Sequence, residues 1–351
     1  MNEFGISLYL GTGFEKNKEI IKKAHENNAK YAFTSLHIPE ETVADYQSEV
    51  KRLLGLCKEN NLSLIVDVGP RTLDKLGYKS FEELKSTSIT HLRLDYGFSN
   101  EEIVKLSRDF KIVFNASTIK DDDLKELEQL GADFSEFYAC HNFYPKEYTG
   151  LSLNSIAKIN SRLKRFGFNT IAFVAGDKEV RGPLFEGLPT CEEHRHQDFL
   201  LSILQLIKIA ETDICMFGDI DIKDDSWKSM KNLSENFVEI HADIDDEYSY
   251  VRDMIHHDRP DSSDYVIRSQ ESRNYILEGR KFPASNVKKR AKGSISISNE
   301  KYLRYAGELE IARKDLRTEE RVNIIGQIWD DDLKYLNYIT EGMGVKLISN
   351  K

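Results

Sequence analysis

Cysteine is scarce in this chain of 351 residues, and its four cysteines, Cys57, Cys140, Cys191 and Cys215, lie far apart. They form no CxxC pair and show no metal-ligand spacing, so we expect reduced, mostly buried thiols. The sequence has no apolar run of about 18 residues, which argues against a transmembrane span. Its first residues have neither the basic nor the apolar region of a secretory signal, so we expect a cytoplasmic protein.

Positive charge is in the minority. The chain has 49 Lys and Arg against 59 Asp and Glu, which gives a formal net charge of −10. This balance argues against nucleic acid as a partner, although a local basic patch can still bind an anion. Hydrophobic residues make up 40% of the chain, which is enough for a globular core and excludes a disordered chain.

Short apolar runs recur along the first two thirds of the chain, each followed by an amphipathic stretch. The runs are residues 5–10, 31–36, 62–67, 91–95, 111–115, 137–141, 170–175 and 213–218. Runs of this kind are typical of parallel strands that are buried on both faces. Alternation of strands and helices predicts a (β/α)8 TIM barrel, with a doubly wound open sheet as the structural alternative.

The pattern changes after about residue 237. Strict alternation at 294–298 and 305–311, together with apolar runs at 321–328 and 345–348, predicts further strands. We therefore expect a TIM-barrel catalytic domain at 1–236 and a smaller, mainly β domain at 237–351. Within the barrel, Thr190 with Glu193 three residues later predicts a long helix from 190 to 210.

In a parallel barrel the reactive residues lie at the carboxyl ends of the strands. The polar residues predicted there are Ser7, Tyr9, Ser35, His37, Asp67, Arg93, Asp95, Asn115, Ser117, His141, Asn142, Asp177, Arg181 and Asp219. Glycoside hydrolysis requires two carboxylates, and Asp67, Asp95 and Asp177 are well placed to supply them. The alternatives are a structural ion pair between Arg93 and Asp95, and helix capping by Asp177 and Asp219.

The histidines form no metal signature, because His141 stands alone and His194 and His196 would point to different faces of a helix. Residues 11–13 lack the rest of a nucleotide-binding fingerprint. We therefore expect no metal and no cofactor. Residues 252–292 carry a local basic excess around Arg268, which suits an anion, the alternative being a solvated loop.

Several segments carry a resemblance to a bacterial family. They are FTSLHIPE (33–40), LRLDYG (92–97), NAST (115–118), HNFYP (141–145), RGP (181–183), GLPT (187–190), EEHR (192–195), VIRS (266–269) and RYAGE (304–308). In this order they resemble the 6-phospho-N-acetylmuramidases, with Cys191 standing where an apolar Leu is expected. The resemblance implies a TIM barrel followed by a cyclophilin-like β domain. It also implies hydrolysis of the β-1,4 bond of N-acetylmuramic acid 6-phosphate–N-acetylglucosamine in cytoplasmic peptidoglycan recycling.

Such a substrate carries a phosphate and a lactyl carboxylate, which need cations. Arg93, Arg181, Arg195 and Arg268 are the candidates for these, and we expect the second domain to close over the barrel mouth with Arg268 at the phosphate. Asn115, Ser117, His141 and Asn142 are candidates for the acetyl and hydroxyl groups, with Ser7, His37 and Asp219 as further binding residues. For catalysis we expect Asp95 and Asp177 as the pair, with Asp67 as the third candidate.

The expected partner is a phosphorylated amino-sugar disaccharide, with neither nucleic acid nor a membrane. Two other functions stay open from the residues alone. One is a sugar-phosphate isomerase or aldolase, which would need a strand-end lysine or a metal cluster. The other is a sugar-phosphate-binding regulator without turnover, which would lack a carboxylate pair.

Overall fold

The computed structural model describes residues 2–35, 46–69, 72–73, 77–94, 97–277 and 279–349. It divides into two compact units, Met1–Ser234 and Glu235–Lys351. The first is the closed parallel barrel predicted from the sequence, and the second is mainly β. No helix among the described residues is long and apolar enough to cross a membrane.

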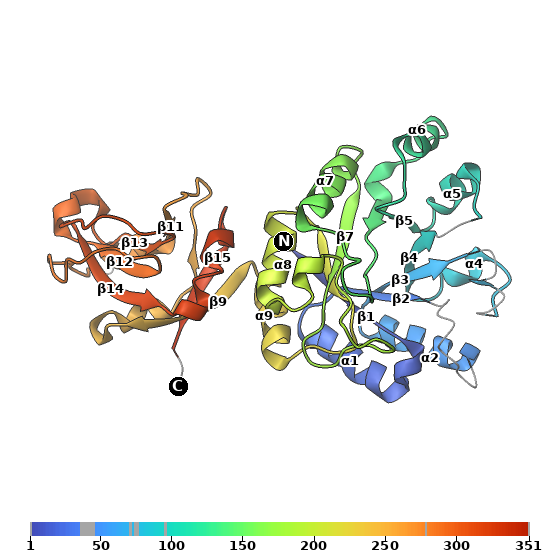
Figure 1. Ribbon diagram of the computed structural model, residues 1–351, viewed down its shortest axis with the longest axis horizontal. Helices are drawn as coiled ribbons and strands as arrows, with labels where there is room; N and C mark the ends of the chain where they lie inside the picture. Colours follow the sequence, from blue (N-terminus) through green and yellow to red (C-terminus); the bar gives the residue numbers. More distant parts are fainter. Residues whose placement is uncertain are drawn as a thin grey trace. The chain divides into compact units, whose positions relative to one another are not determined.

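Eight parallel strands form the barrel in sequential order, and β8 pairs with β1 to close it (Figure 1). The strands are β1 (Glu3–Ser7), β2 (Tyr31–Ser35), β3 (Ser63–Val68), β4 (Ile89–Leu94), β5 (Lys111–Asn115), β6 (Phe137–Cys140), β7 (Asn169–Val174) and β8 (Ile214–Phe217). Closure decides between the two architectures that the sequence left open, because an open sheet has no pairing between its first and last strands.

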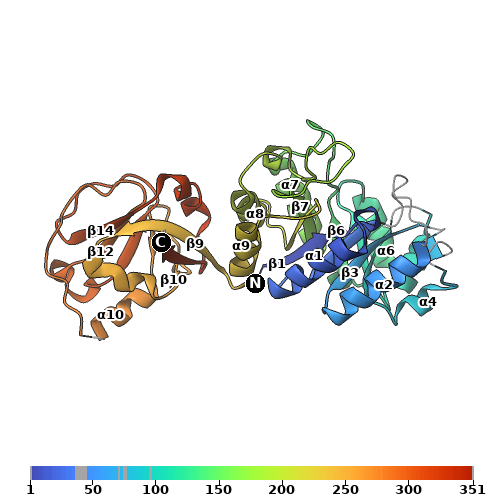
Figure 2. The same ribbon diagram turned by 90° about the horizontal axis from the view of Figure 1, so that it is seen from below.

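Helices surround the barrel. They are α1 (Phe14–Glu26), α2 (Tyr46–Glu59), α4 (Phe81–Leu84), α5 (Asn100–Leu106), α6 (Asp121–Gln129), α7 (Leu153–Lys164), α8 (Phe199–Lys208) and α9 (Asp224–Ser234). The first two pack side by side (Figure 2). Each buries an apolar stripe; α1, for example, buries Ile20, Ile21 and Ala24 while Lys22 and Glu26 face outward.

The helix predicted from 190 to 210 begins too early, by eight residues when its predicted N-cap, Thr190, is compared with the actual N-cap, Asp198. The structure has a short 3₁₀ turn at Glu192–His194, and α8 starts only at Phe199, with Asp198 as its N-cap accepting from the Leu201 amide. Thr190 is buried in the preceding loop, where its hydroxyl donates to the Asn142 carbonyl. The Thr190 hydroxyl therefore makes a tertiary hydrogen bond instead of the capping-box hydrogen bond that the local sequence pattern predicted.

Side chains fill the barrel interior in layers, as in other barrels of this type. An apolar cluster fills much of the interior and consists of Phe33, Ile65, Val113, Cys140, Ile171, Phe173, Ile214 and Met216. On β1, a Cβ at Gly5 would lie 2.8 Å from the Tyr31 carbonyl oxygen, so the close approach of the β2 backbone requires glycine. The polar residues at the carboxyl ends of the strands lie above this apolar floor.

The second unit is one seven-stranded sheet in the order β10-β15-β9-β14-β12-β13-β11. Its strands are β9 (Phe237–Ile244), β10 (His256–His257), β11 (Val266–Arg268), β12 (Ser294–Ser298), β13 (Leu309–Ala312), β14 (Val322–Ile328) and β15 (Gly344–Ile348), with a short helix α10 (Asn274–Leu277). The expected strands at 294–298, 321–328 and 345–348 are confirmed. The expected strand at 305–311 begins later, because residues 300–305 form a 3₁₀ turn. Strands β9, β10 and β11 were not foreseen.

Candidate active site

Four polar side chains meet in the layer above the apolar floor of the barrel. The strand register places Asp67 of β3 beside Arg93 of β4. Arg93 donates from Nη1 to Asp67 Oδ1 at 2.6 Å and from Nη2 to Asn142 Oδ1 at 2.6 Å. Asn115 Nδ2 donates more weakly to the same oxygen of Asn142, at 3.4 Å. We call Asp67, Arg93, Asn115 and Asn142 the mouth cluster.

The ion pair within the mouth cluster is nearly buried. The side chains of Arg93 and Asp67 are 12% and 13% exposed. Charge-assisted bonds of this length are strong, and they fix the carboxylate in one orientation. Arg93 thus pairs with Asp67 of the neighbouring strand; Asp95, the partner considered from the sequence, lies outside the described residues, as does His37.

Aromatic rings form the floor beneath the mouth cluster. Phe143 packs edge-on against Phe33 and Phe173, with ring centroids 6.2 and 5.2 Å apart. The Arg93 guanidinium lies 6.0 Å from the Phe33 ring centroid. A floor of this kind lowers the local dielectric, which strengthens electrostatic interactions with any group that enters.

Asp177 holds the start of a helix. Its Oδ1 accepts from the Lys223 amide at 2.8 Å, and its Oδ2 accepts from the Ser226 hydroxyl at 2.7 Å. Both residues lie at the first turn of α9, so the helix-capping alternative describes Asp177 correctly. Both carboxylate oxygens are engaged in this role.

Asp219 anchors the loop that follows β7. It is fully buried and accepts from the backbone amides of Gly176, Arg181 and Leu188 at 2.7–2.9 Å. Burial raises the pKa of Asp219, while the three amide donors oppose that rise. Asp219 thus has a structural role in the loop that carries Arg181, and its expected contact with substrate stays a prediction.

Arg181 lies on the opposite side of the mouth, beside β1. Its guanidinium carbon lies 4.1 Å from the centroid of the Tyr9 ring. The Tyr9 hydroxyl donates to the carbonyl of Gly218, just past β8. Cation–π stacking on a fixed ring orients the guanidinium fork, which is the group best suited to phosphate or carboxylate.

Arg195 joins two loops rather than facing the mouth. Its side chain is only 2% exposed, and it donates from Nε and Nη2 to Glu192 at 2.8 Å. It also donates to the backbone carbonyls of four residues, two in the loop after β6 and two in the loop after β7. These are Tyr144, Lys146, Glu186 and Gly187. The hydrogen bonds from Arg195 hold the pKa of Glu192 at about 2.

Three further candidates have local partners. Ser7 is buried and donates to the Phe217 carbonyl at 2.8 Å. His141 points away from Asn142 and into the layer under α7, where Nε2 lies 2.8 Å from Asn160 Oδ1. Burial lowers the pKa of His141, so the ring is neutral near pH 7. Ser117 lies exposed at the rim, and its amide donates to Asn115 Oδ1.

Arg268 belongs to the second unit, on β11. Its Nη2 donates to Asp261 Oδ2 at 3.1 Å, and its amide donates to Asp258 Oδ1. The side chain is 27% exposed. The expected role of Arg268 at the phosphate, and the closure of the second unit over the barrel, therefore stay predictions.

Some polar centres escaped the sequence analysis. Asp221 is fully buried, and its Oδ2 forms ion pairs with the Nζ atoms of Lys16, Lys23 and Lys178 at 3.1–3.2 Å. Burial acts to raise the pKa of Asp221, but hydrogen bonds from Trp227 and the three lysines outweigh it and hold the pKa at about 2. The residues come from distant segments, so no local motif signals this cluster.

Among the described residues, one group offers three ligand atoms close enough for a metal ion: Glu147, Glu186 and His196, whose atoms lie within 4.8 Å of one another. His196 is largely exposed and pairs with Glu147 at 3.2 Å. Carboxylates and imidazole at the surface commonly take this arrangement without a metal. The same contact shows, however, that the loops after β6 and β7 meet at their tips.

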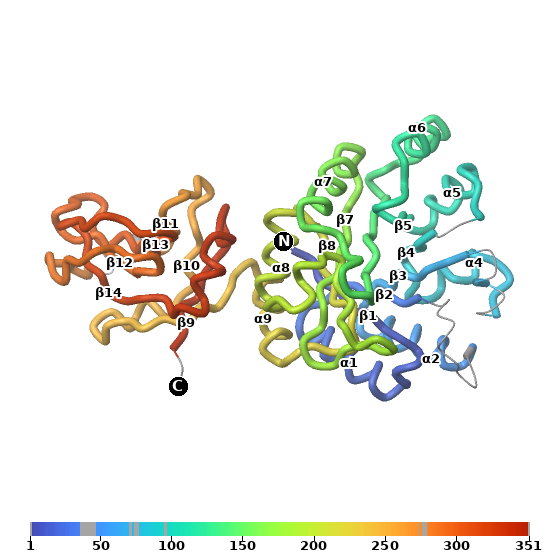
Figure 3. The backbone as a smooth tube through the Cα atoms, in the orientation of Figure 1, coloured from blue at the N-terminus to red at the C-terminus, as the bar shows by residue number. Residues whose placement is uncertain are grey.

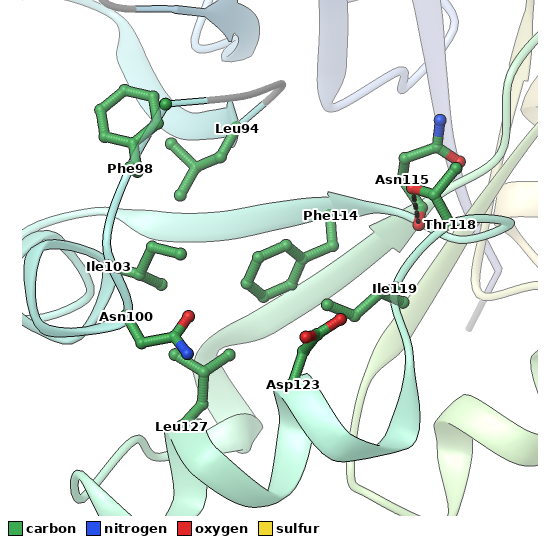
Figure 4. Close-up of a pocket in the computed structure, with 11 residues that line it drawn as sticks. Leu94, Phe98, Asn100, Ile103, Phe114, Asn115, Thr118, Ile119, Asp123 and Leu127 are labelled. Carbon is green, nitrogen blue, oxygen red and sulfur yellow. Dashed lines mark hydrogen bonds between the residues drawn. The ribbon is translucent and has the colours of Figure 1, made fainter.

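A pocket of about 450 Å³ opens between α5 and α6, outside the barrel (Figure 4). Phe114 points into it, whereas the amide of Asn115, the next residue on β5, points away (Figure 4). Its lining mixes apolar side chains, such as Leu94 and Ile103, with polar ones, such as Asn100 and Asp123. The pocket therefore lies behind the mouth cluster and shares only the Asn115 position with it.

Two family models match the chain almost from end to end. The 6-phospho-N-acetylmuramidase N-terminal model matches residues 4–232, and the corresponding C-terminal model matches residues 237–348. The chain belongs to the 6-phospho-N-acetylmuramidase family. The junction between the two matches falls where the barrel ends and β9 begins.

Two solved structures resemble this family member over its full length. One is a conserved protein of unknown function from Enterococcus faecalis, with 30% identity, a TM-score of 0.76, and coverage of 99% of this chain and 96% of the other. The other is an uncharacterized protein from B. cereus, with 26% identity, a TM-score of 0.76, and coverage of 99% of both chains. No curated protein matches the chain significantly.

Proposed function

We propose that this protein hydrolyses the β-1,4 bond of N-acetylmuramic acid 6-phosphate–N-acetylglucosamine, releasing N-acetylmuramic acid 6-phosphate and N-acetylglucosamine. The observation that carries the proposal is the mouth cluster, a carboxylate held by Arg93 and flanked by two amides above an aromatic floor. It occupies the catalytic end of a barrel in a chain that matches both halves of the family. Recovery of cell-wall sugars in the cytoplasm is the setting in which such a product is useful.

Within this proposal, Asp67 supplies the negative charge. A carboxylate that accepts from a guanidinium at 2.6 Å is suited to stabilise the oxocarbenium-like transition state, to attack it, or to orient the 2-acetamido group. It is poorly suited to donate a proton. Asp95 directly follows the last residue of β4 in the sequence, so we retain it as the candidate general acid.

Asp177 is the weaker of the three carboxylate candidates. Both of its oxygens already accept hydrogen bonds from the first turn of α9. A role in chemistry would require it to leave these partners. The proposed pair is therefore Asp67 and Asp95, which revises the order of preference from the sequence.

Arg181 is the proposed ligand for the phosphate or the lactyl carboxylate. Arg195 is buried beneath the loops, whereas Arg181 is partly exposed and its guanidinium is stacked on the Tyr9 ring. Arg268 of the second unit is a further proposed phosphate ligand. The Asn115 and Asn142 amides are the proposed partners of the substrate acetyl and hydroxyl groups.

The decisive experiment supplies the phosphorylated disaccharide and detects free N-acetylglucosamine by mass spectrometry. Asp67→Asn and Asp95→Asn should lower turnover by orders of magnitude while the disaccharide still binds. Asp177→Asn is the matched control, with the same chemical change and an expected loss of stability of about 1 kcal/mol instead of activity. Equal turnover losses in all three variants would contradict this assignment.

Two further outcomes bear on the anion ligands and on the alternatives. Arg181→Ala and Arg268→Ala should weaken binding of the phosphorylated disaccharide more than that of its dephosphorylated form, and an equal loss on both would remove the phosphate role. Tight binding by the wild-type protein without release of N-acetylglucosamine would favour the sugar-phosphate-binding regulator instead.

A further inference from the structure

Two large aromatic side chains stand exposed on the loops that follow β6 and β7. Tyr148 is 88% exposed and Phe185 is 65% exposed, and Leu184 beside Phe185 is 50% exposed. Apolar surface grouped in this way commonly marks a binding site. The two loops lie side by side at the carboxyl end of the barrel (Figure 3), where the Tyr144 amide donates to the Pro189 carbonyl.

Both aromatic residues have a left-handed backbone. The φ angle is +63° at Tyr148 and +59° at Phe185. Bulky side chains rarely adopt this region, and the strain persists only where the surrounding structure imposes it. Strain of this kind also occurs at ligand clamps, and here it coincides with exposed aromatic rings on two loops whose neighbouring residues Glu147 and Glu186 meet.

Buried anchors hold these loops rigidly. Glu192 accepts from the Tyr148 amide and from the Gly150 amide, both at 2.8 Å. Arg195 binds Glu192 and carbonyls of both loops at once. The rings are therefore presented on a fixed base, and little conformational entropy is lost when a ligand binds.

The two loops also meet at their tips. The carboxylates of Glu147 and Glu186, each adjacent in sequence to one of the aromatics, lie within 4.8 Å of each other and of His196. The first loop starts at Asn142 of the mouth cluster, and the second carries Arg181. The aromatics thus stand a few residues outward from the groups proposed to hold the charged sugar.

The charge around the two rings selects against an anion. Residues 143–150 and 182–196 contain four glutamates against one lysine and one arginine. Arg195 and Glu192 neutralise each other in an ion pair, which leaves three glutamates against one lysine. A phosphorylated sugar is repelled from such a rim, whereas a neutral sugar is not. Sugar rings stack their C–H faces on aromatic rings, which the exposed Tyr148 and Phe185 rings permit.

We propose that Tyr148 and Phe185 form an aromatic rim that binds the uncharged leaving-group sugar, while the phosphorylated ring lies inward at Arg181 and the mouth cluster. The proposal rests on the proposed function and adds to it the residues that hold the leaving-group sugar. It assigns the two aromatics as binding residues that recognise the sugar beyond the cleaved bond.

Gly182 supports the position of one ring. A Cβ on this residue would lie 3.0 Å from Phe185 Cζ, so the ring folds back against the glycine backbone. Gly182→Ala should push the Phe185 ring aside and weaken the same sugar contact without removing the ring.

The test compares two substrates that share the phosphorylated ring. One is the disaccharide, and the other is the methyl glycoside of N-acetylmuramic acid 6-phosphate, which has no second sugar. Phe185→Ala and Tyr148→Ala should each lower kcat/KM on the disaccharide by about tenfold, mainly through KM, and leave the methyl glycoside nearly unchanged. Phe185→Tyr should restore most of the loss.

The matched control is Leu303→Ala in the second unit. Leu303 is also apolar, 80% exposed and left-handed, with φ +54°, so its removal reports the effect of losing any strained surface side chain. Leu303→Ala should leave kcat/KM unchanged on both substrates.

Each remaining outcome has a definite meaning. Equal losses on both substrates, or no loss on the disaccharide, would overturn the aromatic rim while leaving the proposed function intact. A change from oligomer to monomer in a variant that combines Tyr148→Ala with Phe185→Ala, with unaltered kinetics, would overturn the rim in favour of an interface between copies of the chain. Failure of the wild-type protein to hydrolyse either substrate would overturn the proposed function itself, and the rim with it.

Discussion

Arg195 allows a direct test between two roles, that of a substrate ligand and that of a buried structural link between loops. The structure has it donating to Glu192 and to four backbone carbonyls, with 2% of its side chain exposed. Arg195→Ala removes all of these donors and leaves Glu192 without its cation. Breaking a buried ion pair of this kind costs about 3–5 kcal/mol.

The loss can be converted into a melting temperature. A unit of this size loses roughly 2–4 °C per kcal/mol, so Arg195→Ala should lower the melting temperature of the barrel by on the order of 10 °C. Arg195→Lys keeps the charge but has one nitrogen in place of a planar fork, so it should recover only part of the stability. Glu192→Gln provides the companion measurement, because it removes the negative charge but keeps one acceptor oxygen of the two that receive the Tyr148 and Gly150 amides.

Differential scanning calorimetry combined with disaccharide kinetics distinguishes the readings. A structural link predicts a large fall in melting temperature, and a KM that rises equally for phosphorylated and dephosphorylated substrates as the loops loosen. A melting temperature within about 2 °C of wild type, together with a loss confined to the phosphorylated substrate, would refute the reasoning and make Arg195 a ligand.

Three other substitutions test buried polar groups. Burial lowers the pKa of His194 to about 4, so between that pH and about 6.5 the unfolded chain binds a proton at this histidine and the folded chain does not. The free energy of unfolding should therefore fall by roughly 2 kcal/mol from pH 7 to pH 5. In urea titrations, His194→Gln should lack this pH-dependent part of the stability. Asp219→Ala leaves three backbone amides unpaired, at about 1–3 kcal/mol each, and should speed proteolysis within residues 176–188; unchanged cleavage would contradict its anchoring role. Arg313→Ala leaves the buried Asp258 carboxylate without its cationic partner. It should destabilise the second unit by about 3–5 kcal/mol without shifting the barrel transition in calorimetry.

The barrel itself is predictable because its signal is repeated. Each of the eight strands is a short apolar run. If one run is less clearly apolar than the others, the regular alternation of strand and helix can still be recognised. The strand-end rule also predicts the mouth cluster, since Asp67 and Arg93 hold equivalent positions on neighbouring strands and the register brings them together. What the sequence does not reveal is which way a residue next to a strand end points, and so His141 and Asn142 were grouped although they face opposite sides.

The second unit was harder to predict for a physical reason. β10 has two residues and β11 has three, so neither is long enough to show alternation. Their stability comes from partners far along the chain: His256 pairs with Val345, and Arg268 pairs with Glu310. Where strand length approaches the minimum, non-local pairing decides the structure and local pattern carries almost no information.

The three aspartates Asp67, Asp177 and Asp219 show that residue type alone does not tell which carboxylate at a strand end is catalytic. All three follow or end an apolar run, yet Asp177 and Asp219 are engaged by backbone amides on the β7–β8 side, whereas Asp67 faces a guanidinium across β3 and β4. Carboxylates that satisfy backbone amides fix loops, and a carboxylate oriented by a side chain remains suited to meet a developing positive charge. The two halves of the barrel mouth therefore have different tasks: β3–β6 carry the proposed chemistry, and the loops after β6 and β7 are braced to hold the sugar against it.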